Sequence, residues 1–207
     1  ATRASLGALS AHDAIDGYQS GSRQRAALIA EAGFNAVAAR GIGYIGVPAS
    51  FEKQGQRVRL VDRVLRESFG NCLDLSMVLA GVWEQSGLHA LVLFTQGHAM
   101  PAMWTHASHL PEPAIDEPAR IRNLIELGEI VPVESTTLTR SGGTFAQAVE
   151  AAKKTLANPG ATFCAVDIRC SRKRGVRPLP LRDDEEGTTL DLSAIEPTPA
   201  PVTAGTM

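Results

Sequence analysis

One segment constrains the fold more than any other part of the sequence: a helical pattern over residues 72–86, followed at once by two strand patterns. The apolar positions of this helix recur at helical spacing and share one face: Leu75, Leu79, Val82 and Trp83. The next two segments, 89–96 and 98–104, are short apolar runs typical of buried strands. An apolar helix face beside apolar strands predicts that this helix packs directly on a sheet.

The rest of the chain continues this order, with helices early and strands late. The other predicted elements are helices over 22–41, 60–69, 119–128 and 143–158 and strands over 129–136 and 162–170. Pro101 inside the 98–104 strand favours a sheet edge or a bulge, because proline cannot donate to a ladder. The order predicts an α+β fold with an antiparallel sheet packed on the cysteine-bearing helix.

Length and composition predict one folded domain. The chain has 207 residues, 44% hydrophobic and 20% charged, which suffices for one substantial core. Residues 1–21 are small and polar and predict a flexible segment. Residues 183–207 are acidic and then rich in Pro, Thr and Ala, which predicts a disordered tail or linker. The folded domain is therefore expected over 22–182.

Charge and cysteine content narrow the class of partner and the compartment. The net charge is -2 and the pI about 6.2, which argues against direct nucleic-acid binding. The basic run 169–174 is expected to be a solvated loop. Cys164 and Cys170 lack a metal or redox spacing, so a reduced, cytoplasmic location is expected. The sequence contains no run of about 18 apolar residues, which is the length that would predict a membrane-spanning helix.

Cys72 follows a glycine–asparagine turn at the predicted helix start, where two roles are open to it. Unpaired N–H groups and the helix dipole lower a thiol pKa there, and a nearby imidazole lowers it further. His98 opens a strand and Glu134 ends the next one, so both could meet Cys72 at one end of the sheet. Core packing is the alternative, and it is the commoner role of a lone cysteine.

Four motifs carry a resemblance to a known family. They are GNCLD, QSGLHALVL, GHAMPAMW and VPVEST. From Tyr44 to Thr136 the chain resembles a transglutaminase-like domain of the papain-like cysteine-enzyme superfamily. Over about 28–182 it is similar to such domains in large bacterial proteins that also carry helicase-type NTPase and nuclease regions. The resemblance implies a papain-like core with the nucleophile helix packed on an antiparallel sheet.

The resemblance also implies roles for particular residues. Cys72 would be the nucleophile, His98 the base, and Glu134 the third member, although the family's usual acid is aspartate. Gln56 is the candidate side-chain donor to an oxyanion. Trp104 is spaced further from the histidine than the family's common tryptophan, and either walls the site or packs in the core.

Two functions therefore stay open. The first is a cysteine-dependent acyl-transfer enzyme that acts on a protein or peptide by hydrolysis or transglutamination. The second is a non-catalytic recognition or regulatory module within a larger chain. Neither needs a cofactor. His98, His106 and His109 lack the spacing of a metal site, and His106 and His109 are expected in a solvated loop.

Overall fold

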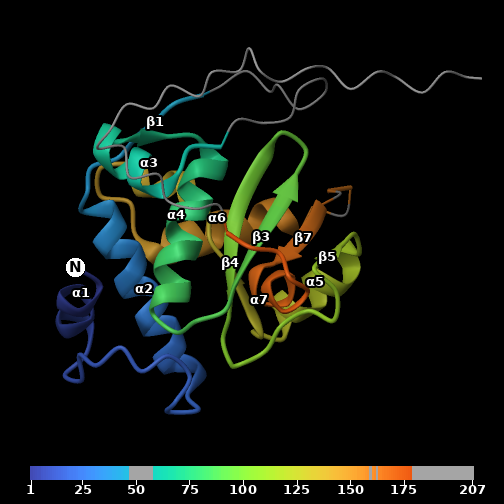
Figure 1. Cartoon of the computed structure of the whole chain (residues 1–207), viewed down its shortest axis with the longest axis horizontal. Helices are drawn as coiled ribbons and strands as arrows, with labels where there is room; N and C mark the ends of the chain where they lie inside the picture. Colours follow the sequence, from blue (N-terminus) through green and yellow to red (C-terminus); the bar gives the residue numbers. More distant parts are fainter. Residues whose placement is uncertain (47–57, 159, 162, 179–207) are drawn as a thin grey trace, which may run out of the picture. The chain divides into compact units, whose positions relative to one another are not determined.

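The computed structural model describes residues 1–46, 58–158, 160–161 and 163–178, and residues Ala1–Arg177 form one compact unit. Five strands form one sheet in the order β5-β7-β3-β4-β6, and every neighbouring pair is antiparallel. They are β3 (Ala90–Thr95), β4 (His98–Trp104), β5 (Ala114–Ile115), β6 (Ile130–Pro132) and β7 (Phe163–Asp167). The fold is α+β, as the sequence predicts (Figure 1).

The described helices surround this sheet. They are α1 (Thr2–Leu9), α2 (Arg23–Ala38), α3 (Val61–Glu67), α4 (Cys72–Gln85), α5 (Pro118–Glu126), α6 (Phe145–Leu156), α7 (Ile168–Lys173) and the 3-10 helix η1 (Ser135–Thr139). A second, two-stranded parallel sheet joins β1 (Gly43–Tyr44) to β2 (Phe69–Gly70), directly before α4. In Figure 1, α4 lies on one face of the five-stranded sheet and α6 lies behind it.

Side chains alternate along the two central strands and so divide the core. Ala90 and Met103 face the core around α4, whereas Leu91 and Ala102 face the core around α5 and α6. Both strands are therefore buried on both faces, which explains why their sequences are almost continuously apolar.

Helix α4 is buried because its apolar face is wide. Leu75, Leu79 and Trp83 are fully buried, and the Trp83 indole N–H donates to the carbonyl of Ala30 on α2 at 3.0 Å. A side chain at Gly33 would lie 3.2 Å from the Trp83 ring, so the glycine permits the close approach of α2 and α4. The prediction that the cysteine-bearing helix packs on an antiparallel sheet is confirmed.

The first turn of α4 is fixed by a capping box. The Asn71 side chain accepts from the backbone N–H of Asp74 at 2.9 Å, and the Asp74 carboxylate accepts from the Asn71 N–H at 3.1 Å. Asp74 is fully buried and also binds the Arg59 guanidinium at 2.9 Å. Because these partners hold the carboxylate on the cap, the start of α4 is set rigidly against the segment that precedes it.

The β3–β4 hairpin sets the position of His98. Thr95 pairs with His98, so only Gln96 and Gly97 form the turn. Gly97 has φ +73°, a conformation that other residues adopt only with strain. His98 is therefore the first residue of β4.

Pro101 lies in a strand that is not at the edge of the sheet, contrary to one of the two sequence expectations. β4 lies between β3 and β6. The Pro101 carbonyl accepts from the N–H of Val133 at 2.9 Å, just beyond the end of β6. The N–H and the C=O of one residue point to the same side of an antiparallel strand. The N–H that Pro101 lacks would therefore face β6, at the point where the pairing between β4 and β6 ends.

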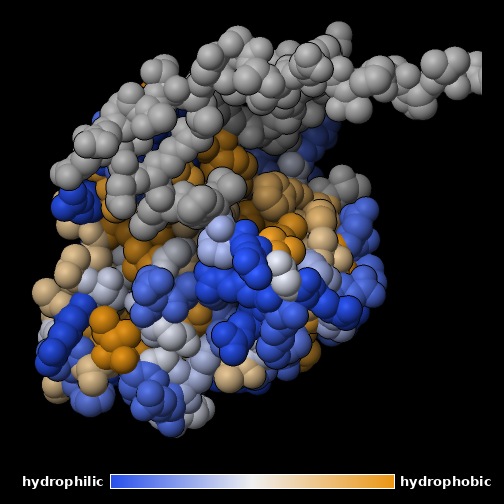
Figure 2. All heavy atoms as spheres, in the orientation of Figure 1, coloured by the Kyte–Doolittle hydropathy of each residue, from blue (hydrophilic) through white to orange (hydrophobic). Residues whose placement is uncertain are grey.

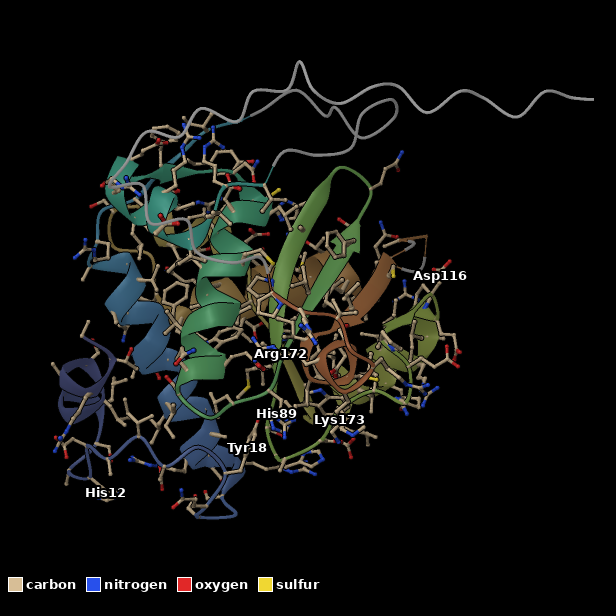
Figure 3. The ribbon with its side chains drawn as sticks, viewed as in Figure 1. His12, Tyr18, His89, Asp116, Arg172 and Lys173 are labelled. Carbon is tan, nitrogen blue, oxygen red and sulfur yellow. The ribbon has the colours of Figure 1, made fainter. Side chains whose placement is uncertain are left out.

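The structure departs from the sequence prediction at the N-terminal end of the compact unit. Residues 1–21, expected to be flexible, contain α1, whose Leu6 is fully buried. In the same segment the Tyr18 hydroxyl donates to the Trp104 carbonyl at 2.7 Å and accepts from the His89 N–H at 2.9 Å (Figure 3). The expected tail over 183–207 lies outside the described residues.

The basic run 169–174 is a helix rather than the expected loop. The buried Asp167 carboxylate caps α7 by accepting from the Cys170 N–H at 2.7 Å, and Cys170 itself is buried. The charged side chains of α7 face outward, and the surface over this helix is hydrophilic in Figure 2. Among the described helices, none combines the length and apolarity needed to cross a bilayer.

Candidate active site

Cys72 is the first residue of α4 and only 7% exposed. Burial acts to raise the pKa of its thiol. Hydrogen bonds from His98 and from the backbone N–H groups of Ala99 and Leu73, together with the charge on His98, outweigh burial and leave the pKa below its ordinary value. The sulfur is thus surrounded by donors from the start of α4 and the start of β4, and these donors stabilise a thiolate.

His98 lies between the thiol and a carboxylate. Its Nε2–H donates to Oε2 of Glu134 at 2.8 Å, which leaves Nδ1 for Cys72. The hydrogen bonds to Cys72 and Glu134 raise the pKa of His98 to about 10, against the opposing effect of burial. A histidine pKa above that of the thiol favours the thiolate–imidazolium pair over the neutral pair near pH 7.

The sequence predicts that Glu134 ends a strand. In the structure Glu134 instead lies two residues after the end of β6 and caps η1. Its Oε1 accepts from the N–H of Thr136 at 3.0 Å and from the Thr136 hydroxyl at 2.7 Å, while Oε2 faces His98. Burial acts to raise the pKa of this carboxyl, but the bonds from His98 and Thr136 lower it further than burial raises it. The longer side chain of glutamate is therefore held in place at both oxygens.

A tetrahedral intermediate on Cys72 would need donors for its oxyanion. The Cys72 backbone N–H lies at the first helical position, where no intrahelical acceptor exists. The Tyr44 hydroxyl, from β1, interacts with the Cys72 sulfur. Burial first, and then the charge on Cys72, raise the pKa of this phenol, so it stays protonated and able to donate. Tyr44 is not among the residues predicted for the site, although an aromatic residue upstream of the cysteine was the available signal.

The sequence offers two further candidates for the site, Gln56 and Trp104. Gln56 lies outside the described residues. Trp104 is at the far end of β4 from His98, about 20 Å away at the usual rise per strand residue. The residue is 3% exposed, and its indole N–H donates to the buried Asp167 carboxylate at 3.0 Å. Trp104 thus belongs to the core and does not wall the site.

The described residues include no group of three or more metal-ligating side chains placed to hold a metal ion. His106 and His109 follow the far end of β4 and are separated from His98 by the length of that strand. His109 Nδ1 donates to the Leu110 carbonyl at 2.7 Å, and Nε2 accepts from Lys173 at 2.8 Å. These bonds occupy both ring nitrogens of His109.

The structure brings Cys72, His98 and Glu134 together from α4, β4 and the start of η1. Comparison of the chain with family models, with curated proteins and with solved structures finds no match. The chemistry of this site is therefore inferred from the geometry of these three residues and from the groups around them.

Proposed function

We propose that this chain is a cysteine-dependent acyl-transfer enzyme with a transglutaminase-like, papain-like core, and that Cys72, His98 and Glu134 form its catalytic triad. One observation carries the proposal. His98 interacts with the Cys72 thiol on one side and lies 2.8 Å from the Glu134 carboxylate on the other, at the N-terminus of a buried helix. This arrangement supplies a thiolate, a proton donor and a group that holds the donor's orientation.

In the first half of the reaction, the Cys72 thiolate attacks the carbonyl carbon of a peptide or side-chain amide. The Cys72 N–H and the Tyr44 hydroxyl stabilise the resulting oxyanion. The His98 imidazolium gives its proton to the leaving nitrogen, the C–N bond breaks, and a free amine and a thioester remain. Glu134 keeps the imidazole oriented throughout and stays ionised.

In the second half, neutral His98 takes a proton from the incoming nucleophile as it attacks the thioester. Water gives a carboxylic acid, and an amine gives a new amide. In both cases the C–S bond breaks and the thiolate–imidazolium pair is regenerated. We propose hydrolysis as the reaction, because water needs no second binding site.

The first test is the pH dependence of Cys72 alkylation by iodoacetamide, followed by mass spectrometry of the Cys72 peptide so that Cys164 and Cys170 do not interfere. We expect a thiolate that titrates below the ordinary value of about 8.5 in the wild type, and a higher thiol pKa in His98→Ala. An ordinary thiol pKa that His98→Ala leaves unchanged would contradict the proposal and favour a non-catalytic recognition module.

Turnover is tested on a peptide mixture, with mass spectrometry of the products in the presence and absence of a primary amine. New carboxyl termini or deamidated glutamines would indicate hydrolysis, and incorporated amine would indicate transfer. Cys72→Ala is expected to abolish either product without changing the unfolding midpoint in urea by more than a small amount, since one sulfur atom is removed.

A further inference from the structure

A pair of buried hydroxyls lies directly beneath the three proposed catalytic residues. Ser76 and Ser135 are both fully buried, and their Oγ atoms are 3.2 Å apart. Ser76 lies one turn after Cys72 on α4, and Ser135 directly follows Glu134. The two side chains therefore join the helix of the nucleophile to the segment of the acid.

Backbone carbonyls of α4 and β4 lie beside these two hydroxyls. The Ser76 hydroxyl lies 2.7 Å from the Cys72 carbonyl and 3.2 Å from the carbonyl of Ala99, the residue after His98. The Ser135 hydroxyl lies 3.3 Å from the same Cys72 carbonyl. The pair thus touches, within one residue along the chain, each of the three elements that supply Cys72, His98 and Glu134.

We infer that Ser76 and Ser135 are positioning residues, which act as one hydrogen-bonded unit to fix the relative placement of Cys72, His98 and Glu134. The inference rests on the proposed function. The two hydroxyls have two protons to donate, and three oxygen acceptors lie within reach: two carbonyls and one hydroxyl. The acceptor that one proton binds therefore determines which acceptors remain for the other proton. Ser76 is the centre of the unit because it contacts both carbonyls as well as Ser135.

Ala99 connects the Ser76 hydroxyl to the sulfur of Cys72. Its N–H donates to the Cys72 sulfur, while its carbonyl lies beside the Ser76 hydroxyl. Ser76 therefore holds both the residue that carries the thiolate and the strand residue that donates to it. Loss of the Ser76 hydroxyl would remove the donor from the Ala99 carbonyl and one of the donors from the Cys72 carbonyl. Helix α4 and strand β4 could then shift apart, which would weaken the donors around the sulfur.

A serine that bonds the carbonyl four residues earlier is common in helices and often has no role beyond packing. The chain offers a matched control for this simpler role. Ser86, at the other end of α4, is buried and donates to the Val82 carbonyl at 2.8 Å. It makes the same local bond as Ser76 but lies far from Cys72.

The experiment measures the pH profile of Cys72 alkylation by iodoacetamide in the wild type, Ser76→Ala, Ser135→Ala, the double variant and Ser86→Ala. We expect the apparent thiol pKa to rise by about one unit in Ser76→Ala, which lowers the alkylation rate about tenfold at pH values below that pKa. A smaller rise is expected in Ser135→Ala, because Ser76 keeps its bond to the Cys72 carbonyl. Ser86→Ala should keep the wild-type profile.

The double variant tests whether the two hydroxyls act as a unit. We expect its shift to be smaller than the sum of the two single shifts, and an additive result would overturn the pairing. Urea unfolding of each variant in the same buffers establishes that the profiles belong to folded protein. Ser135→Ala serves as the informative variant if Ser76→Ala does not fold.

The outcomes separate this inference from the proposed function. One outcome is that His98→Ala raises the thiol pKa of Cys72, whereas Ser76→Ala and Ser135→Ala leave the pH profile of alkylation unchanged. This outcome would overturn the positioning role alone. An ordinary wild-type thiol that His98→Ala leaves unchanged would overturn the proposed function and the positioning role with it. A change in unfolding free energy without a change in profile would assign the hydroxyls to packing.

Discussion

Replacement of Glu134 by glutamine tests the electrostatic core of the site, because it keeps the shape of the side chain and removes its charge. The carboxylate lies 2.8 Å from the His98 ring nitrogen, and the two side chains are only 12% and 26% exposed. With about 4 Å between the centres of charge and an effective dielectric constant of about 20, the attraction is about 4 kcal/mol. Partial exposure to water reduces this, and we take about half of it.

A loss of about 2 kcal/mol from the imidazolium corresponds to about 1.5 units in the pKa of His98. Because the thiolate is stabilised by that imidazolium, the apparent thiol pKa is expected to rise by about one unit in Glu134→Gln. The assay is the pH profile of Cys72 alkylation, with Glu150→Gln as the control. Glu150 is a glutamate of α6 whose side chain is 78% exposed and 3.9 Å from Lys153.

The same substitution has a consequence for stability against acid. The pKa of Glu134 is lowered in the folded state, so its contribution to stability is present above the ordinary carboxyl pKa and is lost as the pH falls through the folded value. The unfolding free energy of the wild type should therefore fall more steeply below about pH 4.5 than that of Glu134→Gln. An unchanged alkylation profile and parallel acid dependence would refute the electrostatic role assigned to Glu134.

Three further perturbations test separate parts of the structure. Tyr44→Phe removes a donor from the proposed oxyanion site, and we expect turnover on the peptide mixture to fall by about 100-fold while Cys72 is still alkylated; unchanged turnover would exclude that role. Asp74→Ala leaves Arg59 without its partner and removes half of the capping box, so urea unfolding followed by tryptophan fluorescence should show a loss of about 3 to 5 kcal/mol. A loss below about 1 kcal/mol would mean that water replaces the pair. Gly97→Ala forces a side chain to φ +73°, which should cost about 1 to 2 kcal/mol and raise the thiol pKa by displacing His98; Gly142→Ala, at φ +74° in a loop, should cost as much without moving the thiol pKa.

The long, strongly patterned elements could be predicted from the sequence. The helix expected over 72–86 is Cys72–Gln85, and the strand expected over 98–104 is His98–Trp104. The helix shows apolar residues at helical spacing and the strand an almost continuous apolar run, because both elements are buried.

The short elements could not be predicted, because their stability comes from tertiary contacts. β5 has two residues, and α7 depends on the Asp167 cap and on burial of Cys170 rather than on an apolar face. Tyr44 reaches the site only because β1 pairs with β2, an interaction of two residues between distant parts of the chain. The site role considered for Trp104 is wrong, because motif spacing does not record that an extended strand carries its last residue far from its first.

The separation of the three site residues along the chain also bears on when the site forms during folding. His98 and Glu134 are 36 residues apart in sequence, and they meet only after β6 pairs with β4 and η1 packs on α4. Contacts between distant residues form late, because the entropy of closing the intervening loop must be overcome first. In a newly made or unfolded chain, Cys72 therefore has the reactivity of an ordinary thiol. If the proposed function holds, the lowered pKa of the Cys72 thiol would arise only in molecules in which β4, β6 and η1 have assembled around it.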